Sequence, residues 1–271
     1  MKKWIATALT LALTAATLSG CAGGNAADSA QSGVNADNMN AQTETKVPKY
    51  VFLFIGDGMS YPQIQSTSDF LGALNDEDYW QAEPSLDDNQ GATLDGPEYL
   101  NFMNFPAAGS AVTYDSNSFC PDSASTATSI STGHKTYSGT INMDETGTTA
   151  YETIAEQLKD QKDWEIGVIS SVNINHATPA AFYAHQASRS NYYEIGQELV
   201  SSDFDYFAGG AFLDPTGENE DQTSLYDLAK EAGYTVTMTQ AEAEAVNAET
   251  EKALIISEQL ADGDAMAYEL D

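Results

Sequence analysis

Short apolar runs alternate with segments of helical spacing along the chain from residue 48 onward. The apolar runs are rich in β-branched and aromatic residues and have the length of strands, at residues 51–55, 110–114, 166–170, 204–207, 234–238 and 253–256. Helical segments are predicted between them, at residues 123–131, 151–158, 180–187 and 225–232 and in an Ala/Glu-rich stretch after residue 238. This alternation predicts an α/β fold with a mostly parallel central sheet flanked by helices.

The first apolar run, Val51–Ile55, contains no polar residue, which is typical of a strand buried on both faces. It ends in Gly56-Asp57-Gly58. Ligands of parallel sheets bind beyond the carboxyl ends of the strands, so Asp57 is a candidate site residue. Its carboxylate is the kind of oxygen ligand that divalent cations prefer. The alternative is an ordinary turn aspartate between two glycines.

The helix predicted over residues 123–131 has Asp122 as its N-cap and Gly133 as its stop. Ser123 lies in its first turn, where unpaired backbone N–H groups favour anions such as phosphate. No Gly-x-Ser-x-Gly motif is present, and His134 lies too far along the helix to be an obvious base for Ser123. A nucleophilic Ser123 would therefore need activation by a metal ion. The alternative is a plain Asp-capped helix.

A third polar cluster spans residues 176–189. Thr178 offers a hydroxyl ligand shortly after a predicted strand. Arg189 offers a planar fork that matches two phosphate oxygens. We expect His134 and His185 to be structural residues, since a lone histidine is more often structural than a ligand.

The N-terminal residues have the features of an export signal. Lys2 and Lys3 precede an apolar run, Trp4–Leu18, that is too short for a stable membrane span. The run ends in Leu18-Ser19-Gly20-Cys21, which resembles the lipobox of bacterial lipoproteins. That resemblance implies a signal peptide at residues 1–20 and a lipid on Cys21. It also implies an exported cell-envelope protein that is anchored to a membrane and faces away from the cytoplasm. An ordinary secretory signal is the alternative.

Residues 22–46 are mostly small and polar, so they bury too little surface to fold. We predict a lipidated cysteine with a flexible tether at residues 21–47 and a folded domain at residues 48–271. With Cys21 lipidated, Cys120 has no intrachain disulfide partner.

Acidic residues dominate the charge, with 41 Asp and Glu against 10 Lys and Arg. Such a surface repels nucleic acid and anionic lipid, so we expect no nucleic-acid groove and membrane attachment through the lipid anchor only. An anionic substrate would need local positive charge, from a metal ion or from Arg189.

Three stretches together resemble the alkaline phosphatase family: Ile55–Met59, Asp122–Gly133 and His176–Arg189. Their order and spacing match as well. The resemblance implies the alkaline phosphatase fold and hydrolysis of small phosphate monoesters through a phosphoserine intermediate. It also implies two zinc ions and one magnesium ion as cofactors.

The resemblance assigns a role to each candidate residue. Ser123 would be the nucleophile, and Asp122 would orient Arg189, which would hold the phosphoryl oxygens. Asp57 would bridge a zinc ion and the magnesium ion, and Thr178 would bind magnesium. His176 stands where some family members have Asp and others His, and it would bind metal either directly or through water.

The family's histidine-containing zinc ligands come mostly from the half of the chain that follows these motifs. This sequence has three histidines and none after His185. We therefore expect a truncated chain that lacks the C-terminal part of the enzyme and is inactive in isolation.

Two other functions stay open on the sequence alone. A phosphodiesterase on the same fold is one, although Ser123 within Asp-Ser-Ala favours monoesters. A non-catalytic phosphate-binding lipoprotein is the other, and it would keep Ser123 and Arg189 without a zinc site. The oligomeric state is also open, with a homodimer among the alternatives.

Overall fold

The computed structural model describes residues 48–76 and 95–267. The chain divides into two units, one up to Phe54 and the other from Ile55 onward. The predicted signal peptide, Cys21, the tether and residues 77–94 lie outside the described residues. Within the described residues, no helix has both the length and the apolar character needed to cross a bilayer.

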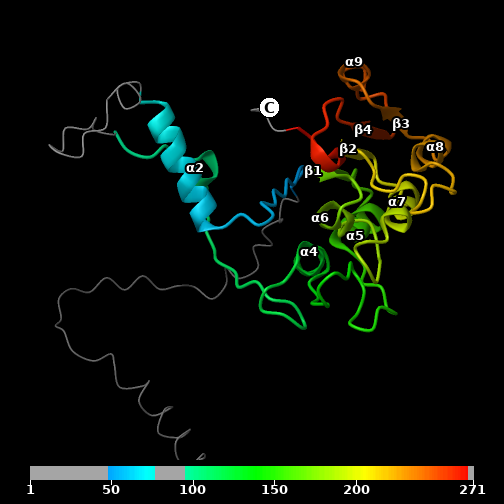
Figure 1. Cartoon of the computed structure of the whole chain (residues 1–271), viewed down its shortest axis with the longest axis horizontal. Coiled ribbons are helices and arrows are strands. Elements are labelled where there is room, and N and C mark those ends of the chain that lie inside the picture. The colour runs from blue at the N-terminus through cyan, green and yellow to red at the C-terminus, as the bar shows by residue number, and fades with distance from the viewer. Residues whose placement is uncertain (1–47, 77–94, 268–271) are drawn as a thin grey trace, which may run out of the picture. The chain divides into compact units, whose positions relative to one another are not determined.

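A parallel sheet of four strands forms the centre of the second unit (Figure 1). Its strands are β1 (Gly167–Asn173), β2 (Tyr206–Gly210), β3 (Thr235–Thr237) and β4 (Ala253–Ile256), in the order β1-β2-β4-β3. All three neighbouring pairs are parallel. The predicted α/β fold with a parallel sheet flanked by helices is therefore confirmed, and four of the six predicted strands are present.

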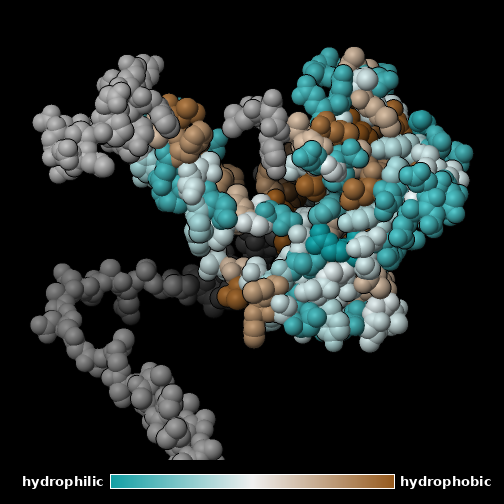
Figure 2. Space-filling model, in the orientation of Figure 1, coloured by the Kyte–Doolittle hydropathy of each residue, from teal (hydrophilic) through white to brown (hydrophobic). Residues whose placement is uncertain are grey.

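One face of this sheet carries the hydrophobic core. Val168, Phe207 and Leu254 are aligned across three neighbouring strands and are buried. The ring of Phe207 meets Tyr183 edge-on, with 5.3 Å between ring centroids, and lies parallel to Phe204. Hydrophilic residues cover the visible outer surface over α7 (Tyr192–Ser201) and α8 (Leu225–Glu231) (Figure 2).

Helices α7 and α8 pack closely because of one glycine. A Cβ atom at Gly196 would lie 2.3 Å from Leu225 Cδ1, well inside van der Waals contact. No helix was predicted at the residues of α7, and a glycine in the middle of a helix lowers its propensity. The structure shows that Gly196 makes room for Leu225 instead.

Capping residues define where two of the helices begin. Helix α4 (Ser123–Thr132) begins after Asp122 and ends at Gly133, which has the left-handed φ of 76°. Helix α5 (Ile154–Lys162) begins three residues later than predicted, after a capping box formed by Thr153 and Glu156. The described residues also form helices α2 (Tyr61–Leu74) and α9 (Gln240–Ala243) and two short 3-10 turns, η2 (Asn101–Asn104) and η3 (Asp262–Asp264).

The predicted helix at Ala180–Ala187 is wrong in position. Helix α6 is Ala177–Ala180, and it ends where the prediction began. Pro179, which precedes the predicted helix, lies within the first turn of α6. The N–H groups of a first turn have no partner inside the helix, so proline is tolerated there.

Two predicted strands, Val51–Ile55 and Ser110–Tyr114, are absent from the structure. Phe52 and Phe54 are 78% and 87% exposed, so this part of the chain is not buried on either face. An apolar run favours burial, but a strand also needs a neighbouring segment that forms hydrogen bonds with its backbone. Within the described residues, neither run has such a neighbour.

Candidate active site

Asp122 connects the start of α4 to Arg189. Its Oδ1 accepts hydrogen bonds from the backbone N–H groups of Ser125 (3.1 Å) and Gly139 (3.0 Å). Its Oδ2 accepts one from Arg189 Nη1 at 2.8 Å. Burial opposes the charged carboxylate, but these hydrogen bonds outweigh it and lower the pKa of Asp122 to about 2. Asp122 is therefore an anion at neutral and alkaline pH.

Arg189 is fixed at both its backbone and its side chain. Its N–H donates to Gly139 O at 2.7 Å, and 26% of its side chain is exposed. Nη2 lies 3.3 Å from Nε2 of His176. It is the single arginine of the 271-residue sequence, so it is the only guanidinium available to an anion bound by this chain.

His176 sits beside Arg189, just before α6. Burial lowers the pKa of His176, the positive charge of Arg189 lowers it further, and the negative charge of Asp57 acts in the opposite direction. The neutral imidazole therefore prevails at neutral pH, and its unprotonated Nε2 accepts the hydrogen bond from Nη2 of Arg189.

Asp57 and Thr178 form the other end of the site. The Thr178 hydroxyl donates to Asp57 Oδ2 at 2.7 Å, across 121 residues of sequence. Asp57 is exposed, whereas Thr178 is half-buried on α6. The charge of Asp57 also acts on His176, so these three side chains are neighbours.

Ser123 is the first residue of α4 and is half-buried. Its hydroxyl lies at the positive end of the helix dipole, where a phosphoryl group or a developing alkoxide is stabilised. Ala124 and Ala127 are buried, and these small side chains let α4 pack against α6. This packing brings the α4 N-terminus and the α6 residues into one region of the unit.

The structure thus brings the predicted site residues into one region. Hydrogen bonds join Asp57 to Thr178 and join Arg189 to both His176 and Asp122. The charge of Asp57 acts on His176, and Ser123 follows Asp122 directly in the chain. Cys21 alone of the predicted functional residues lies outside the described part of the chain.

Sequence reasoning missed the residues that support Asp122. The Ser125 hydroxyl lies 2.8 Å from Asp122 Oδ1 and 3.1 Å from Asp115 Oδ2, and its single proton serves one of them at a time. Asp115 also accepts from the Ser138 hydroxyl and is only 5% exposed. A buried aspartate in a loop has no recognisable spacing, so only Gly139, in a turn-forming Ser-Gly pair, carried a signal in the sequence.

Comparison with known proteins decides the family. The family model described as alkaline phosphatase matches residues 48–205, which is more than half of the chain. The chain belongs to the alkaline phosphatase family. All six site residues named above lie inside the matched segment.

Similar alkaline phosphatases come from animals and bacteria. Alkaline phosphatase 4 of Drosophila melanogaster is 32% identical over 155 residues, which are 55% of this chain and 24% of that protein. Alkaline phosphatase 4 of Bacillus subtilis is 28% identical and matches 70% of this chain and 38% of that protein. The chain thus spans well under half the length of these curated relatives.

Two solved alkaline phosphatases have a similar fold. The cold-active enzyme from Shewanella sp. matches 80% of this chain and 47% of its own, with a TM-score of 0.59 and 26% identity. A mutant of the TAB5 enzyme in which a histidine is replaced by aspartate matches 62% and 46%, with a TM-score of 0.53 and 29% identity. That mutant has Mg bound. Alkaline phosphatase relatives therefore include a metal-binding protein.

The donor atoms of this chain fit part of a metal site. Asp57 and Thr178 present a carboxylate and a hydroxyl oxygen next to each other, and magnesium prefers such hard oxygen ligands. Zinc prefers a cage of histidine, cysteine and carboxylate ligands. In the described ranges, no three such side chains are grouped to hold an ion. The described residues therefore fit a partial magnesium site and do not by themselves fit a zinc site.

Proposed function

We propose that this protein hydrolyses phosphate monoesters, with Ser123 as the nucleophile and Arg189 as the phosphate-binding residue. One observation carries the proposal. Asp122 caps the helix that begins with Ser123 and, through its second oxygen, holds Arg189 at 2.8 Å. A single carboxylate therefore keeps the nucleophile and the anion-binding group in a fixed relation.

The reaction would proceed by two displacements at phosphorus. The guanidinium of Arg189 binds phosphoryl oxygens with its remaining N–H groups, since Asp122 takes an N–H of Nη1 and His176 takes one of Nη2. Ser123 Oγ forms a bond to phosphorus and gives its proton to solvent, while the bond from phosphorus to the leaving oxygen breaks and that oxygen takes up a proton to become the alcohol. A water molecule then attacks phosphorus and loses a proton, the bond between phosphorus and Ser123 Oγ breaks, Ser123 is reprotonated, and inorganic phosphate leaves.

Metal ions complete the proposal for the whole enzyme. We propose two zinc ions and one magnesium ion, as the family resemblance implies. A bound metal would lower the pKa of the nucleophile and offset the charge of the transferring phosphoryl group. Asp57 and Thr178 would hold the magnesium ion, and the neutral His176 would act beside it, directly or through water. No zinc ligand set is assigned within the described residues.

We also propose that the protein is an exported lipoprotein held at the cell envelope through Cys21. The motif Leu18-Ser19-Gly20-Cys21 supports this, and stable anchoring by lipid alone requires more than one acyl chain. Replacing the cysteine, Cys21→Ala, should move the protein from the membrane fraction to the soluble fraction. A variant that stays in the membrane fraction would contradict the lipid anchor.

Turnover of two related substrates tests the proposed reaction. The protein expressed from its complete gene, supplied with zinc and magnesium, should hydrolyse a nitrophenyl phosphate monoester at alkaline pH. It should hydrolyse the corresponding diester far more slowly. Faster turnover of the diester would indicate a phosphodiesterase, and phosphate binding without turnover would indicate a binding protein.

A further inference from the structure

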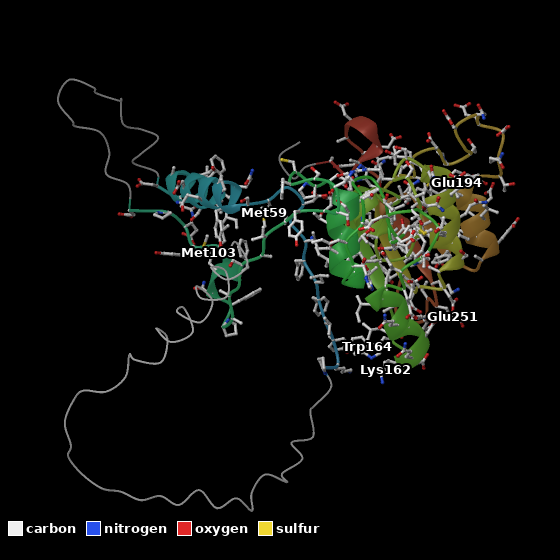
Figure 3. All side chains as sticks on the ribbon, turned by 90° about the horizontal axis from the view of Figure 1, so that it is seen from below. Met59, Met103, Lys162, Trp164, Glu194 and Glu251 are labelled. Carbon is white, nitrogen blue, oxygen red and sulfur yellow. The ribbon has the colours of Figure 1, made fainter. Side chains whose placement is uncertain are left out.

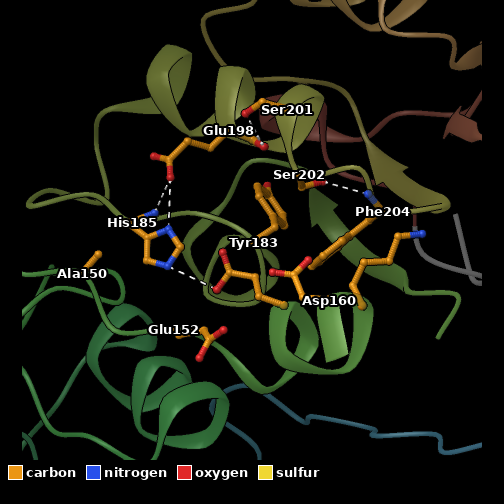
Figure 4. A pocket seen from close by; sticks show the side chains of 11 residues that line it. Ala150, Glu152, Asp160, Tyr183, His185, Glu198, Ser201, Ser202 and Phe204 are labelled. Atoms are coloured by element: carbon orange, nitrogen blue, oxygen red, sulfur yellow. Dashed lines mark hydrogen bonds and ion pairs between the residues drawn. The ribbon is translucent and has the colours of Figure 1, made fainter. Parts of the chain in front are cut away.

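His185 lies between carboxylates from two different helices. Glu198 of α7 places Oε2 at 3.3 Å from His185 Nδ1, and Glu156 of α5 places its Oε2 at 3.4 Å from Nε2 (Figure 4). Nε2 also lies 3.1 Å from the carbonyl oxygen of Tyr151. Both ring nitrogens therefore face acceptors, which is the environment of a doubly protonated imidazolium.

This cluster borders a surface pocket of about 520 Å³. The other charged side chains that line the pocket are Glu152, Lys159 and Asp160. Burial opposes the charge of His185, but its hydrogen bonds to Glu156 and Glu198 outweigh burial and raise the pKa of His185 to about 10. The ion pair thus persists through neutral and mildly alkaline pH.

Glu198 binds more than the imidazole. Its Oε2 accepts the backbone N–H of His185 at 2.8 Å, and its Oε1 accepts Gln186 Nε2 at 2.5 Å. Gln186 in turn accepts from Asn191 Nδ2 through its side-chain oxygen, at 2.9 Å. One carboxylate therefore fixes the start of the segment of residues 185–189, at the end of which lies Arg189.

The same segment is paired with the loop that holds Asp122. Gln186 and Ile141 exchange two backbone hydrogen bonds of 2.9 Å, in an antiparallel bridge. Two residues before Ile141, Gly139 receives the Arg189 N–H at its oxygen and donates its own N–H to Asp122. A displacement of this segment would therefore disturb both members of the Arg189–Asp122 ion pair.

We propose that Glu198, together with the His185 side chain that it shares with Glu156, is a positioning residue for Arg189. It anchors residues 185–186 to α7 and α5 and so sets where the guanidinium meets Asp122. This inference rests on the proposed function, in which Arg189 binds the phosphoryl group. The test of this inference measures the chemical reactivity of Arg189 and not turnover. A negative result would therefore count against the positioning role of Glu198 and leave the proposed reaction unaffected.

The test uses arginine-specific modification of the full 271-residue chain by phenylglyoxal. Because Arg189 is the single arginine, reagent found on the peptide that contains it reports on one guanidinium, apart from any reaction at the α-amino group. Glu198→Gln removes the charge of Glu198 but keeps its size. We expect Arg189 to react about tenfold faster in this variant, as the loss of a charge-assisted hydrogen bond implies. Glu194→Gln is the matched control, since Glu194 is an exposed carboxylate on the same helix (Figure 3).

Amide hydrogen exchange separates positioning from general destabilisation. Exchange should accelerate at residues 185–189 in Glu198→Gln, while exchange in β2 stays unchanged. Equal reactivity of Arg189 in Glu198→Gln and Glu194→Gln would overturn the proposal, and so would a proportional rise of exchange in β2. If Glu198→Gln does not fold, His185→Gln, which keeps the Glu198 bond to Gln186, is tested in the same way. Failure of both variants to fold would show a purely structural cluster and also overturn the proposal.

Discussion

At the scale of single residues, Asp122 makes a different kind of bond with each of its two oxygens. One oxygen caps α4, and the other binds Arg189. Asparagine is an equally good N-cap but carries no charge. The substitution Asp122→Asn therefore separates the two roles of this residue.

We expect Asp122→Asn to leave the melting temperature nearly unchanged and to lower kcat/KM for a phosphomonoester about tenfold to a hundredfold, because Arg189 loses its charged partner. Thermal unfolding and steady-state kinetics of the same preparation measure both effects. A large loss of stability with unchanged kinetics would show that the cap matters and the ion pair does not.

Arg189 provides the second prediction at this scale. Lysine keeps the positive charge but replaces the planar fork with a single ammonium group. Arg189→Lys should weaken product inhibition by inorganic phosphate and lower turnover together, each by about tenfold or more. Inhibition constants for phosphate measure the effect, and equal constants in the two proteins would remove Arg189 from the phosphate site.

At the scale of structural elements, His185 joins α5 to α7 by an ion pair that depends on pH. In the unfolded chain His185 has an ordinary pKa near 6.5, whereas in the fold its pKa is raised to about 10. The contribution to stability is fully present below about pH 6.5 and is lost as pH rises toward 10.

Replacing the imidazole tests this pH dependence. We expect His185→Gln to lower the free energy of unfolding by about 3 kcal/mol at pH 6, since it leaves two carboxylates without their cation. The difference from the unmodified protein should shrink steadily between pH 7 and pH 10. Denaturant unfolding at a series of pH values measures it, and a difference independent of pH would contradict a charged His185.

Elements with signals in their own sequence could be predicted, and those that depend on distant partners could not. The Asp122 cap and the Gly133 stop gave the bounds of α4 to within one residue, and Ala253–Ile256 was predicted as found. Val51–Ile55 has an equally clear apolar pattern but forms no strand. The apolar pattern indicates that these side chains favour burial away from water. It does not indicate which strand would form backbone hydrogen bonds with this segment.

The candidate site shows the same division. Asp57, Ser123, Thr178 and Arg189 belong to short motifs, so the sequence identified them. Asp115 and Glu198 act through partners 10 to 23 and 12 to 13 residues away, in contacts that only the folded loops create.

At the scale of the whole molecule, the formal net charge is −31, and the single guanidinium at the site must attract an anion against that background. Long-range repulsion slows the approach of an anionic substrate, and salt screens it. Raising the ionic strength should therefore lower KM for a phosphomonoester by about two- to fivefold at low salt, with little change in kcat. A KM that rises with salt would mean that local positive charge dominates the approach.

The central claim is that Ser123 forms a covalent bond to phosphorus, and trapping that intermediate tests it most directly. The protein expressed from its complete gene, supplied with zinc and magnesium, is mixed with a phosphomonoester and quenched in acid, and its peptides are analysed by mass spectrometry. The account predicts phosphoserine at Ser123, and no phosphopeptide with turnover reduced by about a thousandfold or more in Ser123→Ala. Phosphate on another residue, or full turnover by Ser123→Ala, would contradict it.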